Sequence, residues 1–240
     1  MSTAPTGRLS GRIAVVTGAS RGIGAAVARR FAKEGARLVL TARTTGALEE
    51  LDDELQEITG EPATLVPMNL SDTNAIDQLG AALFERFGHI DILVGNAGVL
   101  GTLGPLHQTK PKDWDQVMSI NLTANYRLIR SLDPLLRQSE SGRAVFVTSS
   151  VGSAPRAYWG AYAISKAAVE MMVRTWAEEL MQTNLKVNLI NPGATRTSMR
   201  AQAMPGENPE TLKTADQITD QFVDLATADC TLHGKIINLE

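Results

Sequence analysis

The sequence predicts an α/β fold in which a parallel sheet is covered by helices on both faces. Three observations lead to this prediction. Short apolar runs alternate with longer amphipathic segments along the chain, as in β-α-β units. The run at 90–94 is almost entirely apolar, as a strand buried on both faces requires. A glycine-rich turn separates the first apolar run from the first helical segment.

Length and composition predict one domain over residues 1–240 and limit its partners. A chain of 240 residues can form a single unit with a substantial core. The net charge of −3 leaves no basic field, so we expect neither nucleic acid nor a membrane surface as partner. Cys230 is the only cysteine, which argues against disulfides and a multi-cysteine metal site, and we expect no metal.

The sequence also indicates a location. It has no apolar run of about 18 residues, and its start, MSTAPTGRLSGR, lacks the apolar core of a signal peptide. A single cysteine is typical of a reducing compartment. We therefore expect a soluble, unprocessed, cytoplasmic protein.

Strands and helices are expected in alternation. The first strand, at 12–17, is a β-branched run, and the alanine-rich amphipathic helix after it ends at Glu34. The segment 44–59 is charged and amphipathic, and 113–138 is a long helical pattern that Pro134 should end or kink. Further strands are expected at 37–41, 63–67, 90–94, 143–148, 186–191 and 235–239, and further helices at 73–87, 158–182 and 215–228.

Two connections could contribute to a pocket. The segment 99–110 is leucine- and glycine-rich and is expected to be a loop, and 199–209 could be a mobile flap or a plain surface connection. Six apolar residues could line a pocket or could equally be ordinary core or surface: Leu100, Leu103, Val151, Trp159, Met199 and Met204.

The turn after the first strand predicts nucleotide binding. Glycines allow the backbone to turn sharply and approach a pyrophosphate, while the N–H groups of the next helix face its charge. Because a strand precedes the turn and a helix follows it, a simple tight loop is the weaker interpretation. The expected binding residues are Gly18, Ser20, Arg21, Gly22, Ile23 and Gly24.

The end of the second strand favours NADP(H) over NAD(H). The acidic residue that usually binds the adenosine 2′-hydroxyl is missing, and the chain continues with Ala42 and Arg43. Arg43 and Arg21 could converge on a 2′-phosphate, unless both are ordinary solvated arginines. The third strand ends near Asn69 and Leu70, beside the expected adenine position.

Asn96, Ala97 and Gly98 follow the fourth strand, and such strand ends carry ligands in open α/β sheets. Asn121 lies in apolar surroundings within the helical pattern 113–138. A buried asparagine must satisfy its amide, so Asn121 is either purely structural or the anchor of a water.

Tyr162 and Lys166 are four residues apart, so in a helix they lie one turn apart on the same face. The ammonium would favour the phenolate and lower the pKa of Tyr162, which would make the pair a proton donor and acceptor. Ser149 follows the apolar run 144–147 and could hold a substrate oxygen against Tyr162. The alternative is a surface helix with an i,i+4 polar contact.

In order and spacing, these motifs resemble the short-chain dehydrogenase/reductase family over almost the whole chain. The segment 17–24 is similar to its cofactor loop, and Asn96-Ala97-Gly98 to its motif after strand four. The family's catalytic tetrad is matched by four residues of this chain, which are Asn121, Ser149, Tyr162 and Lys166. The segment that meets the nicotinamide resembles Pro192, Gly193, Thr195 and Thr197. A narrower resemblance, through WGAYAISK, INPGATRTSMRA and LGTLGPL, is to bacterial oxidoreductases of the YciK type.

The resemblance implies a single-domain Rossmann fold, with a doubly wound seven-stranded parallel sheet in the order 3-2-1-4-5-6-7. It implies that Tyr162 is the general acid in carbonyl reduction and that Ser149 orients the carbonyl. Lys166 would lower the tyrosine pKa and hold the nicotinamide ribose, so Tyr162 and Lys166 also count as cofactor contacts. Asn121 would fix a water in a proton relay from Lys166. The cofactor supplies the hydride.

Three features depart from the family pattern. Gly95 replaces a frequent asparagine, and Asn69 replaces a common aspartate, although its oxygen can still accept a bond from the adenine amino group. The chain ends at Glu240 without the usual glycine-rich tail, which bears on subunit contacts and pocket closure. The resemblance further implies a homodimer or homotetramer packed through the helices around 114–136 and 158–180.

The leading hypothesis is an NADP(H)-dependent oxidoreductase that interconverts a carbonyl and an alcohol on a small-molecule substrate. The alternative is a catalytically silent NADP(H)-binding sensor or regulator, against which the filled tetrad argues. A third is an enoyl reductase or sugar-nucleotide epimerase on the same scaffold. Enoyl reductases space the tyrosine and lysine more widely, and epimerases usually carry a longer C-terminal substrate domain.

Overall fold

The computed structural model describes residues 7–239, so the first six residues of the start segment and Glu240 lie outside it. Seven parallel strands form one sheet in the order β3-β2-β1-β4-β5-β6-β7, as expected. The strands are β1 Ile13–Thr17, β2 Arg37–Ala42, β3 Thr64–Pro67, β4 Ile92–Gly95, β5 Arg143–Val147, β6 Lys186–Asn191 and β7 Ile236–Asn238. The α-helices are α1 Gly22–Lys33, α2 Thr45–Thr59, α3 Thr73–Phe87, α4 Pro111–Met118, α5 Ala124–Gln138, α6 Ser150–Ser153, α7 Gly160–Glu179, α8 Ser198–Ala203 and α9 Thr219–Ala226.

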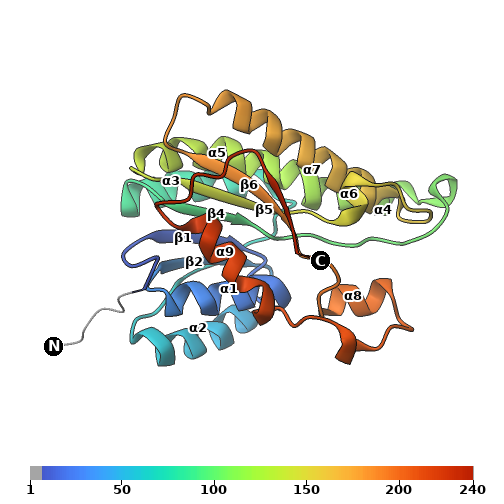
Figure 1. The fold of residues 1–240 in the computed structure, drawn as a ribbon, viewed down its shortest axis with the longest axis horizontal. Helices are drawn as coiled ribbons and strands as arrows, with labels where there is room; N and C mark the ends of the chain where they lie inside the picture. The colour runs from blue at the N-terminus through green and yellow to red at the C-terminus, as the bar shows by residue number, and fades with distance from the viewer. Residues whose placement is uncertain (1–6, 240) are drawn as a thin grey trace.

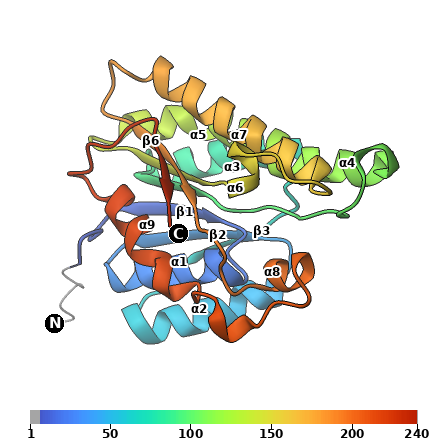
Figure 2. The same ribbon diagram turned by 45° about the vertical axis from the view of Figure 1, so that its right-hand side comes forward.

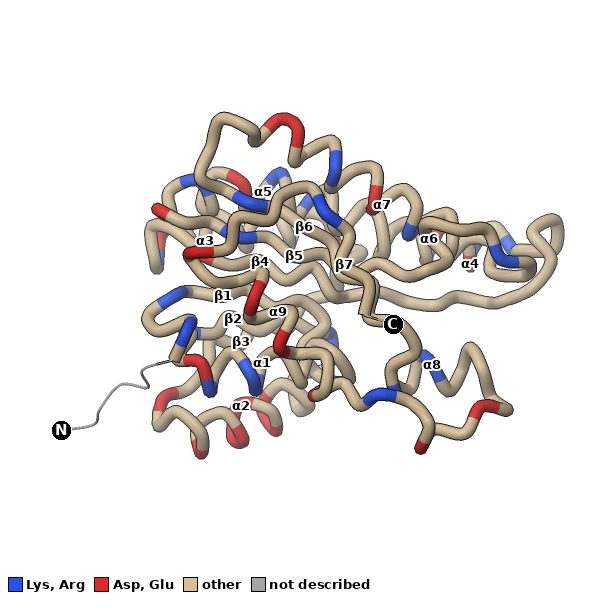
Figure 3. The backbone as a smooth tube through the Cα atoms, viewed as in Figure 1, with Lys and Arg blue, Asp and Glu red and all other residues tan. Residues whose placement is uncertain are grey.

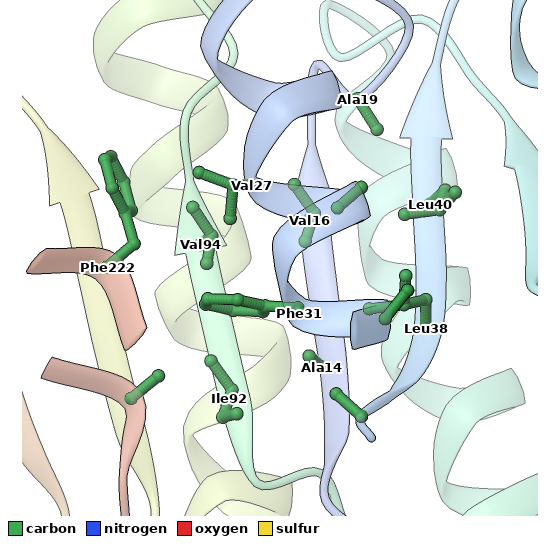
Figure 4. Close-up of a cluster of buried hydrophobic side chains, with 14 of the residues drawn as sticks. Ala14, Val16, Ala19, Val27, Phe31, Leu38, Leu40, Ile92, Val94 and Phe222 are labelled. Carbon is green, nitrogen blue, oxygen red and sulfur yellow. The ribbon is translucent and has the colours of Figure 1, made fainter. Parts of the chain in front are cut away.

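Each face of the sheet has its own hydrophobic core. Helices α1, α2 and α9 cover one face, and α3, α5 and α7 cover the other (Figure 1). On the first face, Phe31 lies over the central strands β1 and β4, and Phe222 lies beside β4 on the side of β5 (Figure 4). On the second, the rings of Phe146 and Trp176 meet edge to face with centroids 6.3 Å apart. Burial on both faces explains why the strands are short and apolar.

From the sequence, Pro134 could either end or kink its helix, and the expectation of an end at this residue is wrong. Helix α5 contains Pro134 and continues to Gln138. The proline is exposed, so the carbonyl group that loses its helical partner can bond to water instead. The irregular stretch of this long helix lies earlier, at the π-helical turn Ser119–Thr123, which separates α4 from α5. Single π-turns within α-helices are frequent at functional sites.

Two elements in the C-terminal half differ in kind or in length from the expectation. Residues 199–209, expected as a flap or a plain connection, include most of helix α8. The last helix is α9, shorter than the expected 215–228 and preceded by a 3₁₀ turn at Asp216–Ile218. Helices α4, α6 and α8 lie toward the same end of the molecule (Figure 2). None of the helices described here is long and apolar enough to cross a membrane.

Helices α3 and α5 approach closely at Gly80, where an added Cβ would lie 2.2 Å from Ser131 Oγ and 2.7 Å from the Ser131 carbonyl oxygen. We expect Gly80→Ala to lower the free energy of unfolding by about 1–3 kcal/mol, because backbone must move to relieve the overlap. The matched control is Gly46→Ala in α2, where a Cβ meets nothing within 4 Å. That variant should be neutral or up to about 1 kcal/mol more stable. Urea unfolding of both variants checks this, and equal effects would contradict it.

Candidate active site

A cavity of about 660 Å³ opens at the carboxyl ends of the parallel strands. Its walls come from the glycine turn after β1, the ends of β2, β3, β4, β5 and β6, and from α7 and α8. The structure brings almost all of the expected site residues to this one cavity. The two exceptions are Gly24 and Asn121, which lie behind its wall.

The glycine turn needs its glycines for two different reasons. Gly18 and Gly22 have φ values of +64° and +57°, which other residues rarely adopt. Gly24 instead permits close packing, because a Cβ there would lie 2.3 Å from the Gly18 carbonyl oxygen and 2.6 Å from Asn96 Nδ2. Gly24 therefore shapes the turn from behind rather than facing a ligand.

Thr17 joins this turn to the end of β4. Its hydroxyl donates to the Val94 carbonyl and accepts the N–H groups of Asn96 and Ala97 at 3.0 and 3.1 Å. Asn96 Nδ2 returns bonds to the carbonyls of Thr17 and Gly18. Asn96 thus fixes the two ligand-facing turns relative to each other. Thr17 belongs to the cofactor-loop motif but was not expected as a site residue.

The end of the cavity beyond β2 and β3 holds the residues expected around an adenosine. Arg21 and Arg43 both line the cavity, as do Asn69 and Leu70. Asn69 Oδ1 already accepts the N–H of Ser71 at 3.1 Å, so only its second lone pair remains for a ligand.

The substitution at Gly95 has a steric reason. A Cβ at this position would lie 2.4 Å from the ring of Phe146 on the neighbouring strand and 3.1 Å from Asn125 Oδ1. The large aromatic side chain therefore occupies the space that an asparagine at position 95 would need.

Tyr162 and Lys166 lie one turn apart on α7. Ser149 lies two residues after the end of β5 and directly precedes α6. Ser149 lies close enough to Tyr162 for its side chain to lower the tyrosine pKa by hydrogen bonding. Lys166 Nζ lies 5.7 Å from the centre of the Tyr162 ring and donates to the Val147 carbonyl at 2.8 Å. The surface-helix alternative is wrong, because both side chains are buried.

The pKa of Tyr162 differs from the expectation. Burial raises the pKa of Tyr162 to about 12, and the hydrogen bond from Ser149 opposes this rise only in part. Burial also lowers the pKa of Lys166 to about 8, because the ammonium loses its hydration. In the chain by itself, desolvation therefore dominates the pKa of Tyr162, and the lowering of that pKa by Lys166 stays a prediction.

Glu170 extends the row of Tyr162 and Lys166 by one more turn. Its carboxylate is buried and accepts bonds from Thr148 Oγ1 at 2.6 Å and from Ser153 Oγ at 2.9 Å. It thus ties the segment that carries Ser149 to the helix that carries Tyr162. Its charge favours the Lys166 ammonium and opposes the effect of burial on the lysine pKa. Sequence reasoning missed Glu170, although its i,i+4 spacing from Lys166 was a usable signal.

Asn121 occupies the π-turn, and its side chain is fully buried. Oδ1 accepts the Val99 N–H at 2.8 Å, and Nδ2 donates to the Val99 carbonyl and to Ser165 Oγ. Ser165 in turn donates to the Tyr162 carbonyl at 2.7 Å. Asn121 therefore joins the loop after β4 to the helix that carries the tyrosine.

Hydrogen bonds among neighbouring residues fix the conformation of the segment after β6. Asn191 Oδ1 accepts the Gly193 N–H, and Thr195 Oγ1 donates to the Pro192 carbonyl at 3.0 Å. Thr197 caps α8 by accepting the Arg200 N–H at 3.1 Å. This segment reaches the cavity in a defined conformation, and α8 continues from it.

An apolar cluster surrounds the Tyr162 side of the cavity. It contains Leu100, Val151, Trp159 and Met199, which line the cavity as the sequence analysis allowed, and also Leu103, which does not line it; Met204 belongs neither to the cluster nor to the cavity lining. Tyr158, the other tyrosine near the motif, is 65% exposed and does not line the cavity. Two arginines were missed: Arg156 precedes α7 and Arg200 lies in α8, and both line the cavity. Arg200 lies within the INPGATRTSMRA segment but was not considered as a site residue, and Arg156 belongs to none of the motifs.

The chain belongs to the short-chain dehydrogenase family, whose model matches residues 12–208. The oxidoreductase YciK of Escherichia coli is 40% identical over 223 residues, which is 92% of this chain and 88% of YciK, and it confirms the narrower resemblance. A short-chain dehydrogenase from Pseudomonas syringae is 40% identical, with a TM-score of 0.95 over 100% of this chain and 98% of that one. One from Shigella flexneri, solved in complex with NADP, is 37% identical, with a TM-score of 0.93 over 98% of this chain and 99% of that one.

We predict that Glu170→Gln lowers the pKa of Lys166 further below its value of about 8. The carboxylate favours the ammonium, so its removal leaves burial less opposed, and a shift of about one pH unit is expected. The matched control is Ser153→Ala, which removes a bond to Glu170 but keeps its charge. An NMR titration of the Lys166 side chain measures both variants. An unchanged or raised pKa in Glu170→Gln would contradict the prediction.

Proposed function

We propose that this protein is an NADP(H)-dependent oxidoreductase that interconverts a carbonyl and an alcohol, with Tyr162 as the general acid and base. The observation that carries the proposal is the meeting of Ser149, Tyr162 and Lys166 at one cavity, beside an apolar cluster, in a chain of this family. The NADP complex of the relative from Shigella flexneri supports the choice of cofactor.

The cavity suits a dinucleotide with a 2′-phosphate. Gly22 faces it with a positive φ, and a Cβ there would meet only Thr197 at 3.5 Å. The turn therefore lets a pyrophosphate approach the start of α1, where N–H groups have no helical partner. At the other end, Arg21 and Arg43 line the cavity and no carboxylate follows β2, which suits a phosphate better than a hydroxyl.

The proposed roles follow from the contacts and the pKa values. The cofactor supplies or accepts the hydride. With a pKa of about 12, Tyr162 is protonated at neutral pH and carries the proton that carbonyl reduction needs, but the raised pKa also makes it a weaker acid than a free tyrosine. Ser149 donates a hydrogen bond that orients the substrate oxygen. Lys166 contributes a positive charge near the phenol and holds the nicotinamide ribose.

Asn121 has a narrower proposed role. Because its side-chain amide is taken up by Val99 and Ser165, a water in a relay toward Lys166 would bind its backbone carbonyl. That oxygen already accepts Asn125 Nδ2 at 2.6 Å and has one further lone pair.

We propose further that residues 1–240 act as one domain in a cytoplasmic homodimer or homotetramer. The exposed apolar side chains of Tyr126 on α5 and of Ile164 and Met171 on α7 support an interface through these helices.

We predict that Tyr162→Phe lowers turnover at least about 100-fold while the affinity for NADPH changes little, because only the acidic proton is lost. Tyr126→Phe, which changes an exposed tyrosine on α5, should leave turnover unchanged. The assay is NADPH consumption across ketones, aldehydes, quinones and keto-esters. Retained activity would exclude Tyr162 as the acid, and tight NADPH binding without turnover on the whole panel would favour the sensor.

We predict that Arg43→Asp weakens NADPH binding by about 10- to 100-fold and NADH binding much less, because a carboxylate there repels the 2′-phosphate. Arg86→Asp makes the same charge change at an exposed residue of α3 that does not line the cavity, and it should affect neither cofactor. Fluorescence titration measures the affinities. Equal losses for both cofactors would show that Arg43 does not read the phosphate.

A further inference from the structure

The cavity is strongly cationic in a protein of net charge −3. Among residues 7–239, no aspartate or glutamate lines it, although acidic residues are frequent elsewhere and gather along α2 (Figure 3). The cationic side chains that line it are Arg21, Arg43, Arg156, Lys166, Arg200 and Lys213. A low-dielectric cleft lined by one sign of charge attracts ligands of the opposite sign.

The proposed cofactor accounts for only part of this charge. Arg21 and Arg43 belong to the phosphate end, and Lys166 is placed beside Tyr162. Lys213 Nζ donates to the Leu239 carbonyl at 3.0 Å. This leaves two arginines that line the cavity: Arg156 before α7, and Arg200 in α8.

These two arginines differ in how their charge is compensated. Arg200 makes two bonds of 2.5 Å to the carboxylate of Glu207, in the bidentate geometry of a paired arginine. Arg156 takes part in none of the ion pairs formed within residues 7–239. The charge of Arg156 contributes to lowering the pKa of Glu207, but both carboxylate oxygens of Glu207 accept hydrogen bonds from Arg200. The positive charge of Arg156 therefore remains uncompensated.

The position of Arg156 relative to Tyr162 is set by Trp159. The Arg156 guanidinium lies over the Trp159 ring, 5.2 Å from its centroid. The Trp159 and Tyr162 rings are adjacent, with centroids 5.9 Å apart and planes inclined by 58°. Arg156 is exposed and makes no side-chain hydrogen bond within residues 7–239, so the contact with the aromatic face leaves its N–H groups available to a planar, bidentate acceptor.

We infer that the substrate is a carbonyl compound carrying a carboxylate at its other end, and that Arg156 binds this carboxylate while the carbonyl lies at Tyr162. The inference rests on the proposed function. Trp159 forms the wall between the two polar ends, and Leu100, Val151 and Met199 supply apolar contacts for the body of the substrate. The span from the guanidinium across one indole to the phenol is that of a small molecule.

The test compares 4-acetylbenzoate with its methyl ester, which share the ketone and the ring and differ in charge. With NADPH, the wild type should show a kcat/KM about 10- to 100-fold higher for the acid than for the ester. In Arg156→Gln this ratio should fall toward one, mainly through KM for the acid. Arg156→Lys should keep an intermediate ratio, because it retains the charge but loses the bidentate fork. Arg174→Gln, an exposed arginine of α7 outside the cavity, should leave the ratio unchanged.

A binding measurement separates this inference from the proposed chemistry. Calorimetry in the presence of NADP⁺, where the ketone cannot be reduced, should show tighter binding of 4-acetylbenzoate than of the ester in the wild type but not in Arg156→Gln. Such binding without turnover with NADPH would keep the carboxylate site and reject the proposed reaction. Turnover of both ketones at equal efficiency, or binding of the acid no tighter than that of the ester, would overturn the carboxylate site.

Discussion

The site depends on a buried polar seam between the end of β5 and helix α7. Lys166 donates to the Val147 carbonyl, and the Thr148 hydroxyl donates to the Glu170 carboxylate. Adjacent residues of one strand end are thus tied to successive turns of one helix. Buried polar groups without partners are costly, so each half of this seam holds the other in place. Ser149 meets Tyr162 because this seam positions both.

The same seam shapes the electrostatics of the site. Lys166 is 4% exposed, and its burial is compensated only in part by Glu170. Burying a cation with little compensation costs stability, and residues with strongly shifted pKa values are concentrated at functional sites. The same loss of hydration raises the pKa of Tyr162, so burial is the main cause of the pKa shifts of both residues.

A second level of organisation lies in the loops at the strand ends. Thr17 and Asn96 join the turns after β1 and β4, and Asn121 joins the loop after β4 to α7. The π-turn at Ser119–Thr123 allows Asn121 to lie in the interior of an otherwise regular helical stretch. In each case a side chain replaces a backbone partner that irregular chain cannot supply.

The sequence by itself determined the alternation of strands and helices, the glycine turn, and the i,i+4 pair of Tyr162 and Lys166. These features depend on local periodicity and backbone geometry, which neighbouring residues encode. Only the tertiary structure decided the continuation of helix α5 past Pro134, the raised pKa of Tyr162, the bonds of Glu170 and the position of Arg156 over Trp159. Exposure, desolvation and charge compensation depend on contacts between segments that are far apart in the chain, and local sequence patterns do not encode these contacts.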